Sequence, residues 1–320
     1  MTLHCRRTSP SQKDERMNSI PSPLFCNECS RASGEQLFAT APRVDVWLLL
    51  EYNGTWGAAT PADSGLPVRI IEHIQHWLDV IPNTKFQFIK RRDASDEAVE
   101  PELIHFYVAR SLEISAELYK IALDSYDDLL TLDIAALALG APEVAETLTD
   151  EQLLLVCTNG RRDAACAKYG TPTYDAFSTI APAASWQSTH LGGHRFAATA
   201  VSLPEGVVYG FVAPEEAADI IHNIRNNTVR LDRMRGRSCY SEVVQAADYF
   251  LREKMSLYDL PGIRYVNHER IDETHWDVRF ETMYNGMLQT IRVERTLSEF
   301  EVFKNSGGTS EQVPQWRYVS

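Results

Sequence analysis

The stretch LLLVCTNGRRDAACAKYG (residues 153–170), followed by STHLGGHRFAATA (188–200), brings two thiols and two imidazoles close together in the sequence. Eight residues separate Cys157 from Cys166, and three separate His190 from His194. Sulfur and imidazole nitrogen are the donors that zinc and iron–sulfur centres use in proteins. The stretch therefore predicts a transition-metal site around which the rest of the chain is organised.

Three local features favour a site over unrelated packed residues. Cys157 directly follows a strong strand pattern, and sites in open α/β sheets lie at the C-terminal ends of strands. Residues 158–162 supply polar and cationic groups that would stabilise a thiolate. The consecutive glycines Gly192 and Gly193 allow the backbone to approach a neighbour closely.

The spacing of the cysteines and histidines does not decide which metal the site would bind. A Cys2His2 zinc site commonly uses H-x(3–5)-H, which the histidines match, and C-x(2–4)-C, which the cysteines do not. A [2Fe–2S] cluster with two cysteines and two histidines has Rieske-type ligands. In this chain, however, one loop would supply both thiolates and the other loop both imidazoles.

Composition narrows the class of protein. The 320 residues suffice for two domains, or for one large domain with an appendage. A formal charge of −13 argues against nucleic-acid binding and favours small molecules or basic partner proteins. The sequence has neither a long apolar run nor an apolar signal-peptide core, and its six cysteines are too few for a secreted disulfide scaffold. We therefore expect a cytoplasmic protein without a membrane partner.

The hydrophobic patterns predict an α/β fold. We expect a disordered arm (1–24), an N-terminal α/β unit (25–148), a second unit with the metal site (149–239), a small α+β hairpin appendage (240–304) and a loose tail (305–320). Both units follow the order β-α-β-β-β-α, with first strands about 107 residues apart, which suggests a weak internal repeat. The dipeptide Asn285-Gly286 predicts a type I′ turn in the appendage.

A second pair of thiols, Cys26 and Cys29, forms a C-x-x-C motif. A redox dithiol of the thioredoxin type follows a strand and opens a helix, and no strand pattern precedes this pair. We therefore interpret Cys26 and Cys29 as two thiols without a shared redox function. A thiol oxidoreductase that uses them remains an alternative.

Three longer runs carry a family resemblance: CTNGRRDAACAKYG, THLGGHRFAATAVSLPEGVVYGFVAPEEA and RGRSCYSEVVQAADYFLRE. They resemble the sucrase/ferredoxin-like family, which includes the actin-patches-distal proteins, over about residues 26–255. The resemblance implies a thioredoxin-like ferredoxin fold with a [2Fe–2S] cluster. Its implied ligands are Cys157, Cys166, His190 and His194, the histidines standing where plain thioredoxin-like ferredoxins carry a second cysteine pair.

The expected function is one-electron transfer, by a redox carrier rather than a substrate-turnover enzyme. Neutral imidazoles in place of two thiolates make a cluster less negative and raise its reduction potential. Solvent-facing imidazole nitrogens would also couple the electron to a proton. Arg161, Arg162 and Arg195 are candidates for tuning the charge around the centre.

The expected partners are redox proteins, a reductase and an acceptor that the sequence does not identify. The alternative to iron is a structural Cys2His2 zinc protein that acts as a binding module. No arrangement of carboxylates in the sequence stands out for glycoside hydrolysis.

Overall fold

The computed structural model describes residues 25–92 and 103–320 of the chain. The arm predicted for residues 1–24 lies outside these described residues. Helix α1 (Cys26–Ser33) is the first described element.

The N-terminal unit is built around strand β1 (Val46–Glu51), whose apolar run is buried on both faces. Strand β2 (Thr84–Lys90) lies parallel to β1, and β3 (Ile104–Ser111) lies antiparallel on its other side. Strand β4 (Ala116–Leu123) pairs antiparallel with β3. Helix α2 (Val68–Val80) connects β1 to β2 and buries one apolar stripe, namely Ile70, Ile74 and Trp77.

A single helix predicted over residues 126–139 is interrupted in the structure. It is divided into a 3-10 helix η1 (Tyr126–Thr131) and α3 (Ile134–Leu139). The Asp133 side chain accepts a hydrogen bond from the Ala136 amide, which caps a new helix start at this position. A further 3-10 helix η2 (Pro142–Thr147) leads to the short strand β5 (Leu148–Thr149), which pairs with β4.

The second unit repeats the strand order and strand directions of the first. Strand β6 (Leu153–Cys157) is followed by α4 (Ala164–Ile180) and by β7 (Ser185–Ser188), which is parallel to β6. After the 3-10 helix η3 (His194–Phe196), β8 (Ala200–Leu203) pairs antiparallel with β6, and β9 (Val207–Tyr209) pairs antiparallel with β8. The unit ends with η4 (Pro214–Glu216), α5 (Ala217–Arg225) and β10 (Met234–Arg237). The internal repeat suggested by the sequence is therefore present in the topology.

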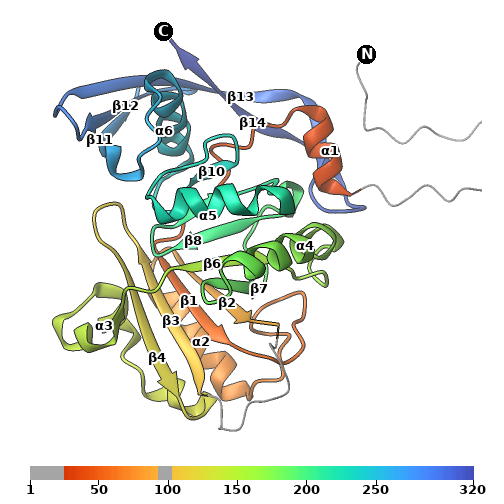
Figure 1. Ribbon diagram of the computed structural model, residues 1–320. Helices are drawn as coiled ribbons and strands as arrows, with labels where there is room; N and C mark the ends of the chain where they lie inside the picture. Colours follow the sequence, from red (N-terminus) through yellow and green to blue (C-terminus); the bar gives the residue numbers. More distant parts are fainter. Residues whose placement is uncertain (1–24, 93–102) are drawn as a thin grey trace, which may run out of the picture.

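The two units join edge to edge through their second strands. β2 and β7 pair antiparallel, with Ile89 opposite Ser188 and Lys90 opposite Gln187. The result is one ten-stranded sheet of order β10-β9-β8-β6-β7-β2-β1-β3-β4-β5 (Figure 1). Because β7 ends at this seam, the loop that follows it runs beside β2 of the N-terminal unit.

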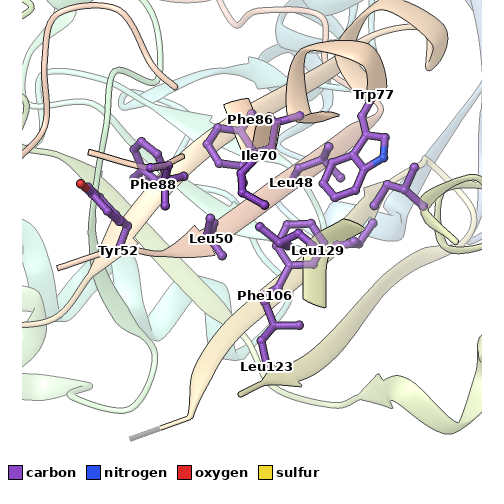
Figure 2. Close-up of a cluster of buried hydrophobic side chains, with 14 of the residues drawn as sticks. Leu48, Leu50, Tyr52, Ile70, Trp77, Phe86, Phe88, Phe106, Leu123 and Leu129 are labelled. Carbon is purple, nitrogen blue, oxygen red and sulfur yellow. The ribbon is translucent and has the colours of Figure 1, made fainter. Parts of the chain in front are cut away.

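Side chains of β1 alternate between two hydrophobic clusters. Leu48 and Leu50 pack with Ile70, Phe88 and other residues beneath α2, as Figure 2 shows. The alternate positions Trp47 and Leu49 belong to a different cluster, on the opposite face of the sheet. That cluster also contains both thiols of the predicted site, Cys157 and Cys166. The core of the N-terminal unit is thus continuous with the surroundings of the site.

The C-terminal part forms a second, smaller sheet. Helix α6 (Glu242–Met255) and the 3-10 helix η5 (Leu260–Gly262) precede β11 (Ile263–Arg270), β12 (His275–Thr282), β13 (Leu288–Phe303) and β14 (Ser310–Val319). These four strands pair antiparallel in chain order. The predicted hairpin at Asn285-Gly286 is present, but its turn is longer than a two-residue type I′ turn. Gly286 has a positive φ of 67°, and the Asn285 side chain accepts hydrogen bonds within the loop.

The prediction of a loose tail for residues 305–320 is wrong. Ten of these residues form β14, which buries Val313 and packs Trp316 into the core beneath α6. Gly307 and Gly308 fall in the turn before this strand, and a proline lies inside the strand. Because glycine and proline are uncommon inside strands, the sequence of this segment did not predict a strand.

Helix α6 lies between the two sheets and contains a fully buried ion pair. The Asp248 carboxylate accepts from Arg252 at 3.0 Å, and Arg252 also donates to the carbonyls of Leu257, Asp259 and Leu260. Asp248→Ala would leave a buried cation unpaired, and we expect it to lower the free energy of unfolding by about 3–5 kcal/mol. Urea denaturation followed by far-UV circular dichroism measures this loss.

The matched control is Asp219→Ala. Asp219 also pairs with an arginine, Arg230, but its side chain is 74% exposed. An exposed ion pair contributes less than about 1 kcal/mol. Equal losses for the two variants would contradict the role assigned to the buried pair.

Candidate metal centre

Cys157 and Cys166 reach the same point from two elements. Cys157 is the last residue of β6, and Cys166 lies in the first turn of α4; both are 1% exposed. Asp163 begins α4 by accepting a hydrogen bond from the Ala165 amide. Gly170 allows α4 to pack tightly against the end of β6, because a Cβ there would collide with the Cys157 carbonyl.

His190 completes a three-donor cluster with these thiols. Its Nδ1 lies 3.8 Å from Cys157 Sγ and 3.7 Å from Cys166 Sγ. The three donor atoms all lie within 4.8 Å of one another. The structure therefore brings together three of the four side chains that the sequence identified.

The two thiols affect each other's ionisation. A hydrogen bond from the Cys166 thiol lowers the pKa of Cys157 well below its ordinary value; burial opposes this effect and His190 assists it. The same hydrogen bond, together with burial, raises the pKa of Cys166. One thiolate thus forms readily beside the imidazole, which is the ionisation state that a metal requires of its first cysteine ligand.

His194 lies next to this cluster, and its ring centroid is 5.2 Å from that of His190. Its Nε2 donates a hydrogen bond to the Lys304 carbonyl, which assigns the proton to that nitrogen. Its Nδ1 is buried and has no hydrogen-bond partner among the described residues. Burial lowers the pKa of His194 and favours the neutral ring. A neutral imidazole with one free, buried nitrogen is a prepared metal ligand.

The turn between β13 and β14 covers His194. Besides the Lys304 carbonyl, it supplies Ser306, whose amide and hydroxyl each donate to the Asp163 carboxylate at 2.8 Å. The contacts of Lys304 and Ser306 cover this side of the site, and Ser306 lies in the segment expected to be a loose tail. Asp163 carried a sequence signal as a helix cap, whereas Lys304 and Ser306 carried none.

The backbone of the His190–His194 loop is held by side chains from other strands. On β2, Gln87 donates to the His190 carbonyl at 3.2 Å and Lys85 donates to the Leu191 carbonyl at 2.7 Å. From β10, Arg235 donates to the Gly192 carbonyl at 2.9 Å. These three residues were not identified from the sequence, because only the strand order places them at the loop.

One glycine of this loop, Gly193, lies directly against the side chain of Arg235. Gly193 has a φ of 71°, and a Cβ at this position would collide with the Arg235 guanidinium. Gly192 also has a positive φ, 103°. The close approach that the sequence predicted is therefore found at Gly193, where the neighbour is Arg235, whereas Gly192 has only ordinary contacts, with Lys85 and Pro42.

The C-x-x-C pair lies on α1 and is not part of the three-donor cluster, although Cys26 lies beside Asp163 at the start of α4. Cys26 and Cys29 are both buried. Cys26 Sγ lies 3.9 Å from Asp163 Oδ1, and burial raises the pKa of Cys26 to about 11. This is the opposite of the low pKa that activates a redox thiol. Cys26, Asp163 and His194 are close enough to form a second donor group, but hydrogen bonds already engage Asp163 and His194.

The three arginines proposed to tune the site differ in position. Arg161 and Arg162 are exposed on the loop between β6 and α4. Arg195 instead pairs with Glu35 at 2.6 Å. Arg195 is thus engaged in a separate ion pair.

The donor set fits a transition metal. Two sulfurs and two imidazole nitrogens are ligands for either zinc or a [2Fe–2S] cluster. Among the described residues, no helix combines the length and apolar composition needed to span a bilayer.

Comparison with known proteins shows partial similarities to one curated relative and to two solved structures. A 102-residue part of the chain is 32% identical to Altered inheritance of mitochondria protein 32 from Meyerozyma guilliermondii, and this match covers 28% of the chain and 36% of that relative. The match thus spans about a third of the relative's length. Two cysteine-to-serine variants of the thioredoxin-like [2Fe–2S] ferredoxin from Aquifex aeolicus are also similar in structure, each with a TM-score of 0.23. Their identities are 16% and 18%, over 26% of this chain and 96% of theirs.

The family model described as sucrase/ferredoxin-like matches residues 37–236. The matched region includes all four predicted ligands and both repeated units from β1 to β10. By this match over more than half of its length, the chain belongs to the sucrase/ferredoxin-like family.

Proposed function

We propose that this protein is an electron carrier with a [2Fe–2S] cluster held by Cys157, Cys166, His190 and His194. The observation that carries the proposal is the convergence of His190 Nδ1 on two buried thiols, beside the unpaired Nδ1 of His194. Membership of a ferredoxin-like family supports iron as the metal. When bound, such a cluster would accept and release one electron.

The chain would determine the properties of this centre through charge and access. Two cysteines supply two negative charges, and two neutral imidazoles supply none, which favours a higher reduction potential than four cysteines would give. The thiols are buried and the turn at Lys304 covers His194, whereas His190 is half-buried. We therefore expect electrons to enter and leave on the His190 side.

A second candidate is a structural zinc site. Ligands of one tetrahedral zinc ion, at the usual Zn–S and Zn–N lengths, lie roughly 3.5 Å apart. The S···N distances of 3.8 and 3.7 Å around His190 are close to this separation. Metal analysis distinguishes the two candidates. The raised pKa of Cys26 gives no support to a thiol oxidoreductase.

The partners would be a reductase and an acceptor. With a net charge of −13, we expect basic docking faces on these proteins and weaker association at high salt. The composition favours the cytoplasm, whereas the name of the fungal relative points to mitochondria. Cell fractionation with antibodies against the untagged chain decides between the two compartments.

The first prediction concerns metal content. Protein purified without oxygen from iron-replete cells is expected to contain about two irons per chain, a red-brown chromophore and a rhombic EPR signal after reduction. Colourless protein with one zinc per chain would instead establish the structural site. A Cys157→Ser variant should lose the iron, while Cys239→Ser, at a buried thiol outside the centre, should keep it.

The second prediction concerns the histidine ligands. His194→Cys adds a thiolate to the centre, and its extra negative charge is expected to lower the midpoint potential while about two irons remain bound. Redox titration followed by EPR measures the change. His222→Cys, on the exposed side of α5, is the matched control and should leave the potential unchanged. An unaltered potential in His194→Cys would exclude His194 as a ligand.

The third prediction concerns proton coupling. His190 Nδ1 faces the thiols, so its outer Nε2, which has no hydrogen-bond partner among the described residues, would release a proton on oxidation. The midpoint potential should therefore fall as pH rises between about 6 and 10. His194 Nε2 keeps its proton on the Lys304 carbonyl.

The two histidines then behave differently in a redox titration at several pH values. His190→Cys is expected to remove most of the slope, and His194→Cys to preserve it. A wild-type potential that does not vary with pH would refute the coupling.

A further inference from the structure

Two cationic side chains near the site, Lys85 and Arg235, have no carboxylate among their hydrogen-bond partners in the described residues. Lys85 Nζ donates to the Leu191 carbonyl, and the charged groups that act on it are Arg235, Arg162 and Cys157. Two of these are positive, so the Cys157 sulfur is the one that favours a charged Lys85. In the described part of the chain, Lys85 forms no ion pair with a carboxylate.

Arg235 is more deeply buried, with 2% of its surface exposed. It donates to the Gly192 and Thr40 carbonyls and to the Thr40 hydroxyl, none of which carries a charge. Glu35 is the nearby carboxylate that favours its charged form, and Glu35 is already bonded to Arg195 and Ser30.

Such an arrangement is unfavourable without a counter-charge. Burial opposes the charged forms of both side chains and lowers the pKa of Lys85 to about 8 and that of Arg235 to about 9. Buried cations are normally paired, because removing a charge from water costs several kcal/mol. The ligand loop between them contains no acidic residue.

We infer that Lys85 and Arg235 are the internal counter-charges of the metal centre, and that they hold the His190–His194 loop in its ligating position. This inference rests on the proposed function, since the anion it requires is the pair of thiolates with their bound metal. Both cations bond to successive carbonyls of the loop, Leu191 and Gly192. Each cation is thereby held against the loop that joins the two histidines.

The inference gives the N-terminal unit a part in the chemistry of the second unit. Lys85 lies on β2, whose neighbour at the seam is β7. Gln87, two residues further along β2, bonds to the His190 carbonyl. The first unit contributes no ligand; it contributes the charge and the hydrogen bonds that position one.

The test replaces Lys85 with uncharged residues. Lys85→Met keeps the length of the side chain without its charge, and Lys85→Gln keeps a hydrogen-bond donor without the charge. A nearby positive charge stabilises the reduced, more negative centre. Both variants are therefore expected to favour the oxidised form by about tenfold, a downward shift of about 59 mV for a one-electron couple.

Lys120→Met is the matched control. Lys120 is a half-buried lysine of the same sheet, but it is paired with Glu151 at 2.6 Å. Its replacement should leave the midpoint potential unchanged. Lys85→Arg, which keeps the charge, should stay closer to wild type than either neutral variant.

Iron content and circular dichroism, measured on every variant, separate the possible failures. Wild-type protein without iron would refute the proposed function itself. Iron-loaded, folded Lys85 variants with a wild-type potential would overturn the counter-charge alone. If Lys85→Met misfolds, the potential of Lys85→Gln decides. A shift in Lys85→Met that is absent in Lys85→Gln would show that Lys85 does not act through charge.

Discussion

The antiparallel pairing of β2 with β7 is the contact on which the rest of this structure depends. It joins two units of the same topology into one sheet and brings the end of β7 beside the edge strand of the first unit. The ligand loop begins where this pairing stops. Thr189 continues the contact, since its amide donates to the Phe88 carbonyl and its hydroxyl accepts from the Phe88 amide. The position of His190 is therefore fixed from both sides of the seam.

The two repeated units carry different residues near the seam between β2 and β7. The first unit has the strand order of the second, yet it carries no cysteine between Cys29 and Cys157. Its residues at the corresponding edge bond to the ligand loop of its neighbour instead. One copy of the fold thus carries the candidate donors, and the other carries Lys85 and Gln87, which bond to the loop between the two histidines.

The sequence was sufficient for the α/β fold class, for the repeated strand order and for the grouping of Cys157, Cys166 and His190, because these depend on short-range patterns. Cys157 follows a continuous apolar strand, and the spacing of the histidines is visible directly. Lys85 and Arg235 could not be found in this way, since they reach the loop from strands that are distant in sequence. The β14 strand was missed for a different reason: Pro314 and the preceding glycines weakened a pattern that depends on Val313 and Trp316.

The closure of the site by the turn at Lys304 and Ser306 has a consequence for biosynthesis. All four donors, and the strands that hold them, are translated before residues 304–306 exist as part of the chain. On the ribosome, His194 and Asp163 therefore lack the partners that cover them in the finished structure. The order of synthesis therefore leaves an interval in which the His194 side of the cluster is uncovered. Once β13 and β14 have paired, that turn covers His194 and Asp163.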